Sequence, residues 1–179
     1  DDSRRGQDVL QEQVNSQHPL SKFTVGNLDT LADFDGRPLR PELLAIYKKY
    51  YSANIMKLVV LGSESLDELQ AMVEPRFAPV VNNQVVVNAP AAPLFAPGQL
   101  PMQLSIVPLQ NSRSLSLNFP LPKMFPYWQK KPASYLAALL GHEGEGSLLE
   151  ALKVRGWAEG LSAGTGLEDR GGALFFVDI

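Results

Sequence analysis

The stretch that most constrains the fold is residues 139–165, where two helix patterns flank a glycine-rich loop. The leucines before Gly141 recur at helical spacing, and glycine suits the position that follows a helix end. Residues 142–146 form an acidic, glycine-rich loop. Ser147 and Glu150 then have the spacing of a capping box, which predicts the start of a second helix. The sequence therefore predicts two consecutive helices joined by a short loop that carries carboxylates.

A strand pattern follows the second predicted helix. Gly156 is expected to end that helix, and Trp157 leads into a short strand at Leu161–Thr165. Asp169–Gly172 has the composition of a turn, and the apolar run Ala173–Ile179 predicts a second strand. Helices followed by strands that a turn connects are typical of an α+β fold.

The rest of the chain adds helices and strands of the same kind. Residues 1–17 contain too few apolar positions for more than a weak helix prediction. Pro41 suits the first turn of a helix to about Tyr51, and Ile55–Leu61 reads as a strand. A second capping box, Ser65 with Glu68, predicts another helix, which Pro75 is expected to end or kink.

Residues 79–101 contain five prolines, which favour extended backbone and indicate a linker. After it, alternation predicts an antiparallel pair of strands at 102–106 and 115–119. We expect an α+β fold with two lobes, each an antiparallel sheet covered by helices. The domains are predicted at 1–81, 82–101 (the linker) and 102–179, and the first lobe is expected to need strands from upstream sequence.

Three ordered segments resemble one known family. The first reads HPLSKF from His18 and is followed by Gly-Asn and Thr-Leu pairs, the second reads YYSANIM from Tyr50, and the third reads GHEGEGSLLEALKVRGW from Gly141. Together they span most of residues 16–179. The chain resembles the insulin-degrading enzyme and pitrilysin (insulinase-like) family of zinc peptidases, specifically the non-catalytic segment after the zinc-binding half. The resemblance implies a zinc metalloendopeptidase as parent protein, with zinc as its cofactor.

This segment lacks the family's zinc motif. The sequence contains neither His-x-x-Glu-His nor His-Glu-x-x-His, and Gly146 stands where the second histidine of the latter would be. His18 and His142 are the two histidines, far apart in sequence, and His18 is expected to hydrogen-bond its own loop. We therefore expect no catalytic residue and no metal ligand here, and a fragment that is inactive alone.

The resemblance also implies a site that holds the N-terminal end of a peptide substrate. Carried over by position, it comprises Gly141, Glu143, Leu161, Ala163 and Thr165. Ala163 and Thr165 replace a glycine and a glutamine of well-known members, and Ala138 stands where some members have histidine. A strand of small residues can accept a peptide as an added strand, and a carboxylate can receive the terminal ammonium. The expected partners are peptide substrates and the remaining domains of the parent protein.

Two other interpretations stay open. Gly141 can be a helix cap only, with Glu143 and Glu145 merely solvated, in a structural module that closes a chamber wall. A scaffold similar to processing peptidases would share the fold, although the Gly-His-Glu-Gly loop fits it less well. Binding that requires a free peptide amine would separate a peptide site from a scaffold.

Composition restricts the remaining function classes. The net charge of −3 argues against a nucleic-acid partner, and no apolar run reaches the ~20 residues that span a bilayer. Cysteine is absent, which excludes disulfides. The compartment stays open, and the resemblance favours the periplasm or cytoplasm of a bacterium.

Overall fold

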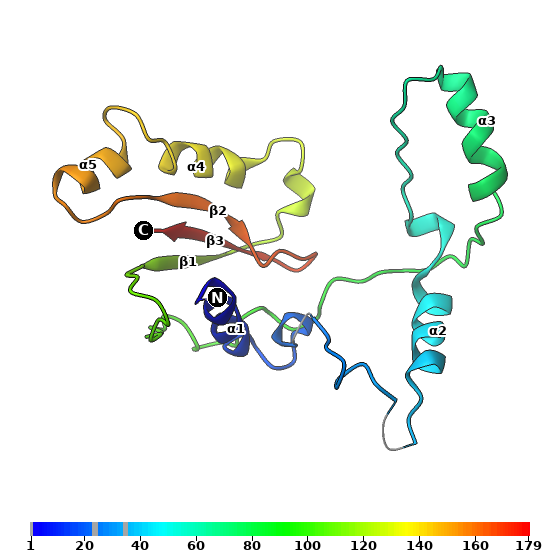
Figure 1. Ribbon diagram of the computed structural model, residues 1–179, viewed down its shortest axis with the longest axis horizontal. Helices are drawn as coiled ribbons and strands as arrows, with labels where there is room; N and C mark the ends of the chain where they lie inside the picture. Colours follow the sequence, from blue (N-terminus) through cyan, green and yellow to red (C-terminus); the bar gives the residue numbers. More distant parts are fainter. Residues whose placement is uncertain (1, 23–24, 34–35) are drawn as a thin grey trace. The chain divides into compact units, whose positions relative to one another are not determined.

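The computed structural model describes residues 2–22, 25–33 and 36–179, which form two compact units. The first unit contains Asp1–Val25 and Asn88–Ile179, and the second contains Gly26–Val87. These spatial units differ from the predicted sequence domains, whose boundaries stay a prediction. Both units are drawn in Figure 1, and each is described by itself below.

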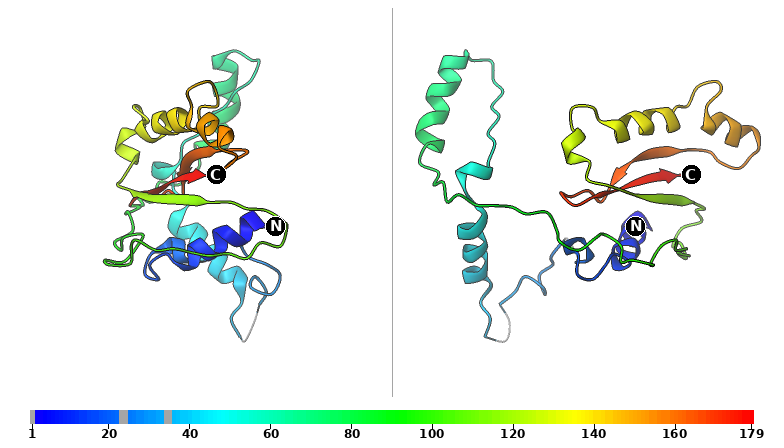
Figure 2. Two further views of the ribbon diagram at one scale, coloured as in Figure 1. Left: turned by 90° about the vertical axis from the view of Figure 1, so that its left-hand side faces the viewer. Right: turned by 180° about the vertical axis from the view of Figure 1, so that it is seen from behind.

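The first unit is built around a small antiparallel sheet in the order β1-β3-β2. Its strands are β1 (Ser116–Leu121), β2 (Ser162–Gly166) and β3 (Ala173–Asp178), and its helices are α1 (Asp2–Glu12), α4 (Pro132–Leu140) and α5 (Leu148–Val154), with short 3-10 turns η1 (Pro19–Ser21) and η3 (Phe125–Tyr127). In Figures 1 and 2, α4 and α5 lie on the β2 side of this sheet and α1 lies on the β1 side. The α+β class is thus confirmed.

The core of this unit lies between the sheet and the helices α4 and α5. It consists of Leu149 from α5, Leu161 before β2, and Phe175 and Val177 of β3, with small residues of α4 packed against it. Ala173 and Leu174 are also almost fully buried. An apolar run without alternation is expected of a strand covered on both faces, and the successive residues Leu174 and Phe175, whose side chains point to opposite faces, are both buried.

The ends of α4 and α5 follow from local sequence. Proline opens α4, and at its end the Gly141 N–H donates to the Ala137 carbonyl. At the start of α5 the Ser147 hydroxyl accepts from the Glu150 N–H at 3.1 Å. Half of the predicted capping box is present, because the Glu150 carboxylate accepts from the Gly146 N–H instead of the Ser147 N–H.

The predicted strand at 102–106 is absent from the structure, and β1 pairs with β3 instead. The neighbouring backbone is held by α1: the Asp2 carboxylate accepts from the N–H groups of Leu109 and Gln110 at 2.9–3.0 Å, and Arg5 donates to the Val107 carbonyl at 3.5 Å. Three backbone groups just after the predicted strand are thus paired with α1 and not with a neighbouring strand.

The second unit consists of helices and extended segments. It contains α2 (Leu39–Tyr50), the 3-10 turn η2 (Ala53–Ile55) and α3 (Leu66–Phe77). The capping box of Ser65 and Glu68 is present in full, and Pro75 does not end α3, which runs to Phe77.

The predicted strand Ile55–Leu61 is not found, and the described part of this unit holds no sheet. The predicted sheet in each lobe is therefore seen in the first unit only. A strand needs a partner for its N–H and C=O groups, and none is available within the described residues of this unit. None of the described helices is long and apolar enough to cross a membrane.

Candidate functional site

Strand β2 is an edge strand, because it pairs with β3 on one side and no other described strand lies beyond it. It reads Ser-Ala-Gly-Thr-Gly, so it carries no bulky side chain of its own, and the Phe176 ring of β3 packs over Gly164 and Gly166. Glycines and small residues along an edge leave room for another backbone to approach. The described sheet has two outer edges, at β1 and at β2, and the edge of β2, next to which α4 packs, is the one made of small residues.

The register decides which backbone groups of β2 face this edge. Leu115 and Ile179 exchange both backbone hydrogen bonds, so Val177 and Phe175 of β3 also bond toward β1. The alternate residues of β3 then bond toward β2, where their partners are Ser162, Gly164 and Gly166. The N–H and C=O groups of Ala163 and Thr165 therefore point outward, to the free edge, and those of Leu161 continue the same alternation.

Gly141 brings the end of α4 close to this edge. A Cβ atom at this position would lie 3.9 Å from the Ala163 nitrogen and 3.0 Å from the Ala137 carbonyl oxygen. Any larger side chain would extend over the backbone of β2 next to an outward N–H group. The glycine keeps that approach open.

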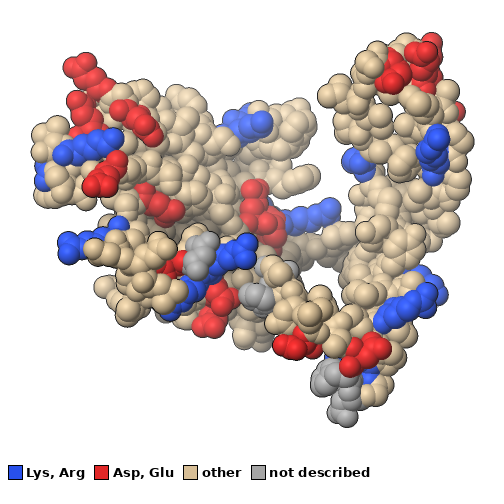
Figure 3. Space-filling model, viewed as in Figure 1, with Lys and Arg blue, Asp and Glu red and all other residues tan. Residues whose placement is uncertain are grey.

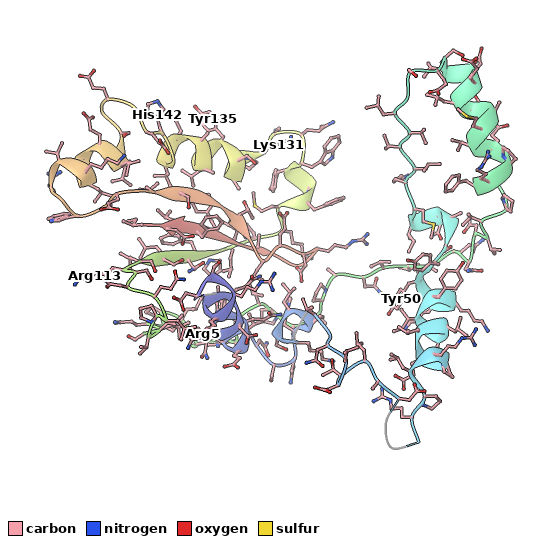
Figure 4. The ribbon with its side chains drawn as sticks, in the orientation of Figure 1. Arg5, Tyr50, Arg113, Lys131, Tyr135 and His142 are labelled. Atoms are coloured by element: carbon pink, nitrogen blue, oxygen red, sulfur yellow. The ribbon has the colours of Figure 1, made fainter. Side chains whose placement is uncertain are left out.

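The loop after Gly141 is ordered by its own side chains. The His142 Nδ1 atom accepts from the Gly144 N–H at 3.2 Å, and the Glu150 carboxylate accepts from the Gly146 N–H. Gly146 has φ +77°, a conformation that favours glycine. Figure 4 shows His142 just beyond α4, on the side of the helix away from the sheet.

The two loop carboxylates, Glu143 and Glu145, are exposed. Acidic side chains are visible at this end of the first unit in Figure 3, above the end of α4. Within residues 2–22, 25–33 and 36–179, no side chain pairs with the Glu143 carboxylate. It is therefore available to a cation from outside.

The sequence-predicted site residues all lie in the first unit. Gly141 and Ala163 are brought together, Glu143 lies in the loop two residues after Gly141, and Thr165 is exposed near the end of β2. Leu161 is 8% exposed and its side chain belongs to the core, so only its backbone can face a peptide. Ala138, on α4, is exposed.

Sequence reasoning missed two contacts. One is the Glu150–Gly146 bond that orders the loop, and the other joins His18 to Asp169, with 3.1 Å between His18 Nε2 and Asp169 Oδ2. The predicted hydrogen bond of His18 within its own loop is confirmed, since its Nδ1 atom accepts from the Leu20 N–H at 3.2 Å. No sequence signal reveals the second contact, because it joins segments about 150 residues apart.

No group of three or more His, Cys, Asp or Glu side chains within the described residues could hold a metal ion. The acidic loop does not form such a group, although it contains two glutamates and a histidine. The residues present in the described part of this chain therefore do not fit a catalytic zinc ion, which takes three protein ligands.

Comparison with known proteins identifies close relatives. The family model described as "Peptidase M16 inactive domain" matches residues 39–179. The A-factor-processing enzyme of Saccharomyces cerevisiae is 42% identical over 169 residues, which cover 93% of this chain and 16% of that protein. Human insulin-degrading enzyme is 39% identical over 168 residues, 92% of this chain and 16% of that protein.

A solved structure has the same fold over nearly the whole chain. The crystal structure of pitrilysin superposes with a TM-score of 0.81 at 28% identity, covering 99% of this chain and 19% of that one. The chain thus spans less than a fifth of the length of the relatives that it matches.

Proposed function

Because this chain belongs to the M16 peptidase family, as its inactive domain, we propose that it binds the N-terminal end of peptide substrates for an insulinase- or pitrilysin-like zinc metalloendopeptidase. In this proposal the chain forms part of the wall of the chamber in which the parent enzyme encloses its substrates, and it performs no chemistry itself. Zinc and the catalytic residues belong to other domains of the parent protein.

The outward backbone groups of Ala163 and Thr165 carry this proposal. A peptide that lies along β2 would exchange backbone hydrogen bonds with these two residues as an added strand. Such pairing depends little on the peptide's side chains, which suits an enzyme that meets varied substrates. Gly141 leaves space for the peptide backbone above Ala163.

Glu143 supplies the recognition of the peptide end. Its exposed carboxylate lies in the loop that follows Gly141, and no described side chain pairs with it. A free N-terminal ammonium that reaches this loop would form a charge-assisted hydrogen bond with Glu143. Because the contact is solvent-exposed, it contributes modestly to affinity and mainly fixes which end of the peptide binds.

The remaining domains of the parent protein are proposed as the second partner. In the second unit, the apolar side chains of Val59 and Leu61 are 89% and 96% exposed. Exposed aliphatic residues of this kind are expected to be covered by other protein surface. Neither nucleic acid nor a membrane is proposed as a partner, in keeping with the net charge of −3.

The alternative is a purely structural module, and the burial of Leu161 favours it. The side chain of this residue, one of the five predicted site residues, packs in the hydrophobic core. Its agreement with the family motif is therefore explained without a bound peptide. The two functions differ in one measurable property, namely whether binding requires a free peptide amine.

The test is a titration of one peptide and its N-acetylated twin in the full-length protein, with a chelator present to stop zinc-dependent cleavage. Glu143→Gln and acetylation are each expected to weaken binding roughly five- to tenfold, and together no more than either alone. Glu145→Gln, two residues further along the same loop, is the matched control and should bind like the wild type. Unchanged affinity after both acetylation and Glu143→Gln would establish the structural module instead.

A further inference from the structure

A buried histidine links the N-terminal segment to the turn between β2 and β3. His18 is only 2% exposed, and both nitrogens of its ring have partners. Nδ1 accepts from the Leu20 N–H at 3.2 Å, so the ring proton lies on Nε2. Nε2 lies 3.1 Å from the Oδ2 atom of the Asp169 carboxylate.

Asp169 is the residue that closes this turn. Its Oδ1 atom accepts from the N–H groups of Gly171 and Gly172 at 2.6 and 3.0 Å, and its own N–H donates to the Gly172 carbonyl at 2.9 Å. One carboxylate oxygen thus organises the turn, while the other faces His18. Any change in the position of Asp169 would be transmitted directly to the residues that precede β3.

The turn requires such support because it contains an unfavourable backbone conformation. Leu167, the residue after β2, has φ +34°, which a leucine rarely adopts. A conformation of this kind persists only where the surrounding contacts enforce it. The hydrogen bonds of Asp169 within the turn, and the approach of His18 to its Oδ2 atom, provide these contacts.

The segment that carries His18 is itself firmly held. The buried Gln11 side chain donates to the Lys22 carbonyl at 2.6 Å, and the Asn15 N–H donates to the Leu94 carbonyl at 2.9 Å. His18 is thus an anchored point from which the turn is positioned.

We propose that His18 is a positioning residue for the peptide-binding edge, and that it acts through Asp169 on the turn and thereby on β2. This inference rests on the proposed function. Thr165, whose backbone faces the edge, lies only two residues before Leu167. Strand β2 is short, contains two glycines and pairs on one side only, so it has little stiffness of its own. The geometry of its outward groups therefore depends on the turn.

Two substitutions separate the two roles of the imidazole. His18→Asn keeps an acceptor near the position of Nδ1 for the Leu20 N–H but does not reach Asp169. His18→Gln carries an amide donor further out, near the position of Nε2. We expect His18→Asn to weaken peptide binding about tenfold, and His18→Gln to restore most of the affinity.

Amide exchange, measured residue by residue in the full-length protein without peptide, provides the second readout. In His18→Asn the Gly164 and Gly166 amides, which bond to β3, should exchange at least tenfold faster, while the Phe175 and Val177 amides keep the wild-type rate. Asp169→Asn should produce the same pattern, and its effect should not add to that of His18→Asn.

Ser21→Ala is the matched control. It removes a hydrogen bond from the Ser21 hydroxyl to the His18 carbonyl in the same turn without affecting the contact to Asp169, and it should leave both readouts unchanged.

Unchanged Gly164 and Gly166 exchange in His18→Asn would overturn the inference. Equally faster exchange of the Phe175 and Val177 amides would also overturn it, since that result means that the whole sheet has lost stability. If the wild-type protein does not distinguish free from acetylated peptide, the proposed function fails, and the exchange pattern still decides the role of His18.

Discussion

Among single residues, Gly141 is the one whose substitution distinguishes two roles, that of a helix cap and that of a position that contacts the peptide. As a cap it needs only to end α4, and its φ of −80° is open to other residues. As part of the peptide edge it must carry no side chain larger than a methyl group, because a Cβ atom there would be in van der Waals contact with the Ala163 nitrogen, at 3.9 Å, and further atoms would extend over the strand. Substitution at this position therefore tests which role applies.

Gly141→Val is expected to weaken peptide binding at least tenfold, because its methyl groups would cover the approach to the outward Ala163 N–H. The measurement is the same peptide titration, with a thermal unfolding curve to verify that the protein is folded. Gly160→Ala is the control, since a Cβ atom at Gly160 meets nothing within 4 Å. Equal affinities for the Gly141→Val variant and the wild type would leave Gly141 as a cap only.

The site residues were predicted from their positions in sequence motifs. Which of their backbone groups face the edge of β2 follows only from the pairing register of the strands. Alternation along β2 cannot tell whether Ala163 or Gly164 bonds to β3, because a one-residue shift exchanges their roles. The pair of Leu115 and Ile179 settles that choice, and these two residues lie 64 positions apart. The His18–Asp169 contact was missed for the same reason.

At the scale of elements, the edge assignment of β2 makes a specific prediction about proline. Ala163→Pro removes an outward N–H group that makes no bond to β3, so the strand should remain folded while peptide binding falls at least tenfold. Gly164→Pro removes a donor of the ladder and should destabilise the unit instead.

Thermal unfolding combined with peptide titration distinguishes the two proline variants. The prediction fails if Ala163→Pro unfolds the protein as strongly as Gly164→Pro, because both positions would then contribute to the ladder.

The capping box at the start of α3, in the second unit, can be tested through its dependence on pH. Hydrogen bonds from the Ser65 side chain and backbone lower the pKa of Glu68 below its usual value of 4.5. A carboxyl group with a lowered pKa in the folded state stabilises that state above its unfolded pKa, and the contribution is lost as the pH falls through the folded pKa. The helix start should therefore loosen in acid, as the pH falls through the lowered pKa of Glu68 and the carboxylate is protonated.

Amide exchange at the first turn of α3, compared between pH 6 and pH 3.5 after correction for intrinsic rates, measures this effect. Glu68→Gln should abolish most of the pH dependence, because glutamine does not titrate. A pH dependence of equal size in this variant would mean that another group is responsible.

Helices were easier to predict than strands, for a physical reason. Helix signals act within a few positions: Ser65 and Ser147 cap α3 and α5, Pro132 is the first residue of α4, and Pro41 lies in the first turn of α2, which begins at Leu39. The predicted strands at 55–61 and 102–106 were wrong because a strand is defined by its partner, which local alternation does not specify. β3 was predicted correctly, since its apolar run needs burial on both faces whatever its partners are.

In the whole molecule, the chain divides into two units and passes between them twice, at residues 25–26 and at residues 87–88. We expect the earliest cuts by a nonspecific protease to fall within 79–101, because proline-rich connecting backbone forms few ladder hydrogen bonds. Mass spectrometry of the first fragments locates the cuts. Early cuts concentrated in 132–156 would instead show that the helices α4 and α5 are the weaker part.

Binding of the peptide along the outward edge of β2 is tested most directly by amide exchange at single residues of this strand. The exchange is measured in the full-length protein, with and without a free-amine peptide and with a chelator present. We expect the peptide to slow exchange of the Ala163 and Thr165 amides at least tenfold, while Gly164 and Gly166, already bonded to β3, change little. If a bound peptide leaves the Ala163 and Thr165 rates unchanged, the peptide does not add a strand to β2.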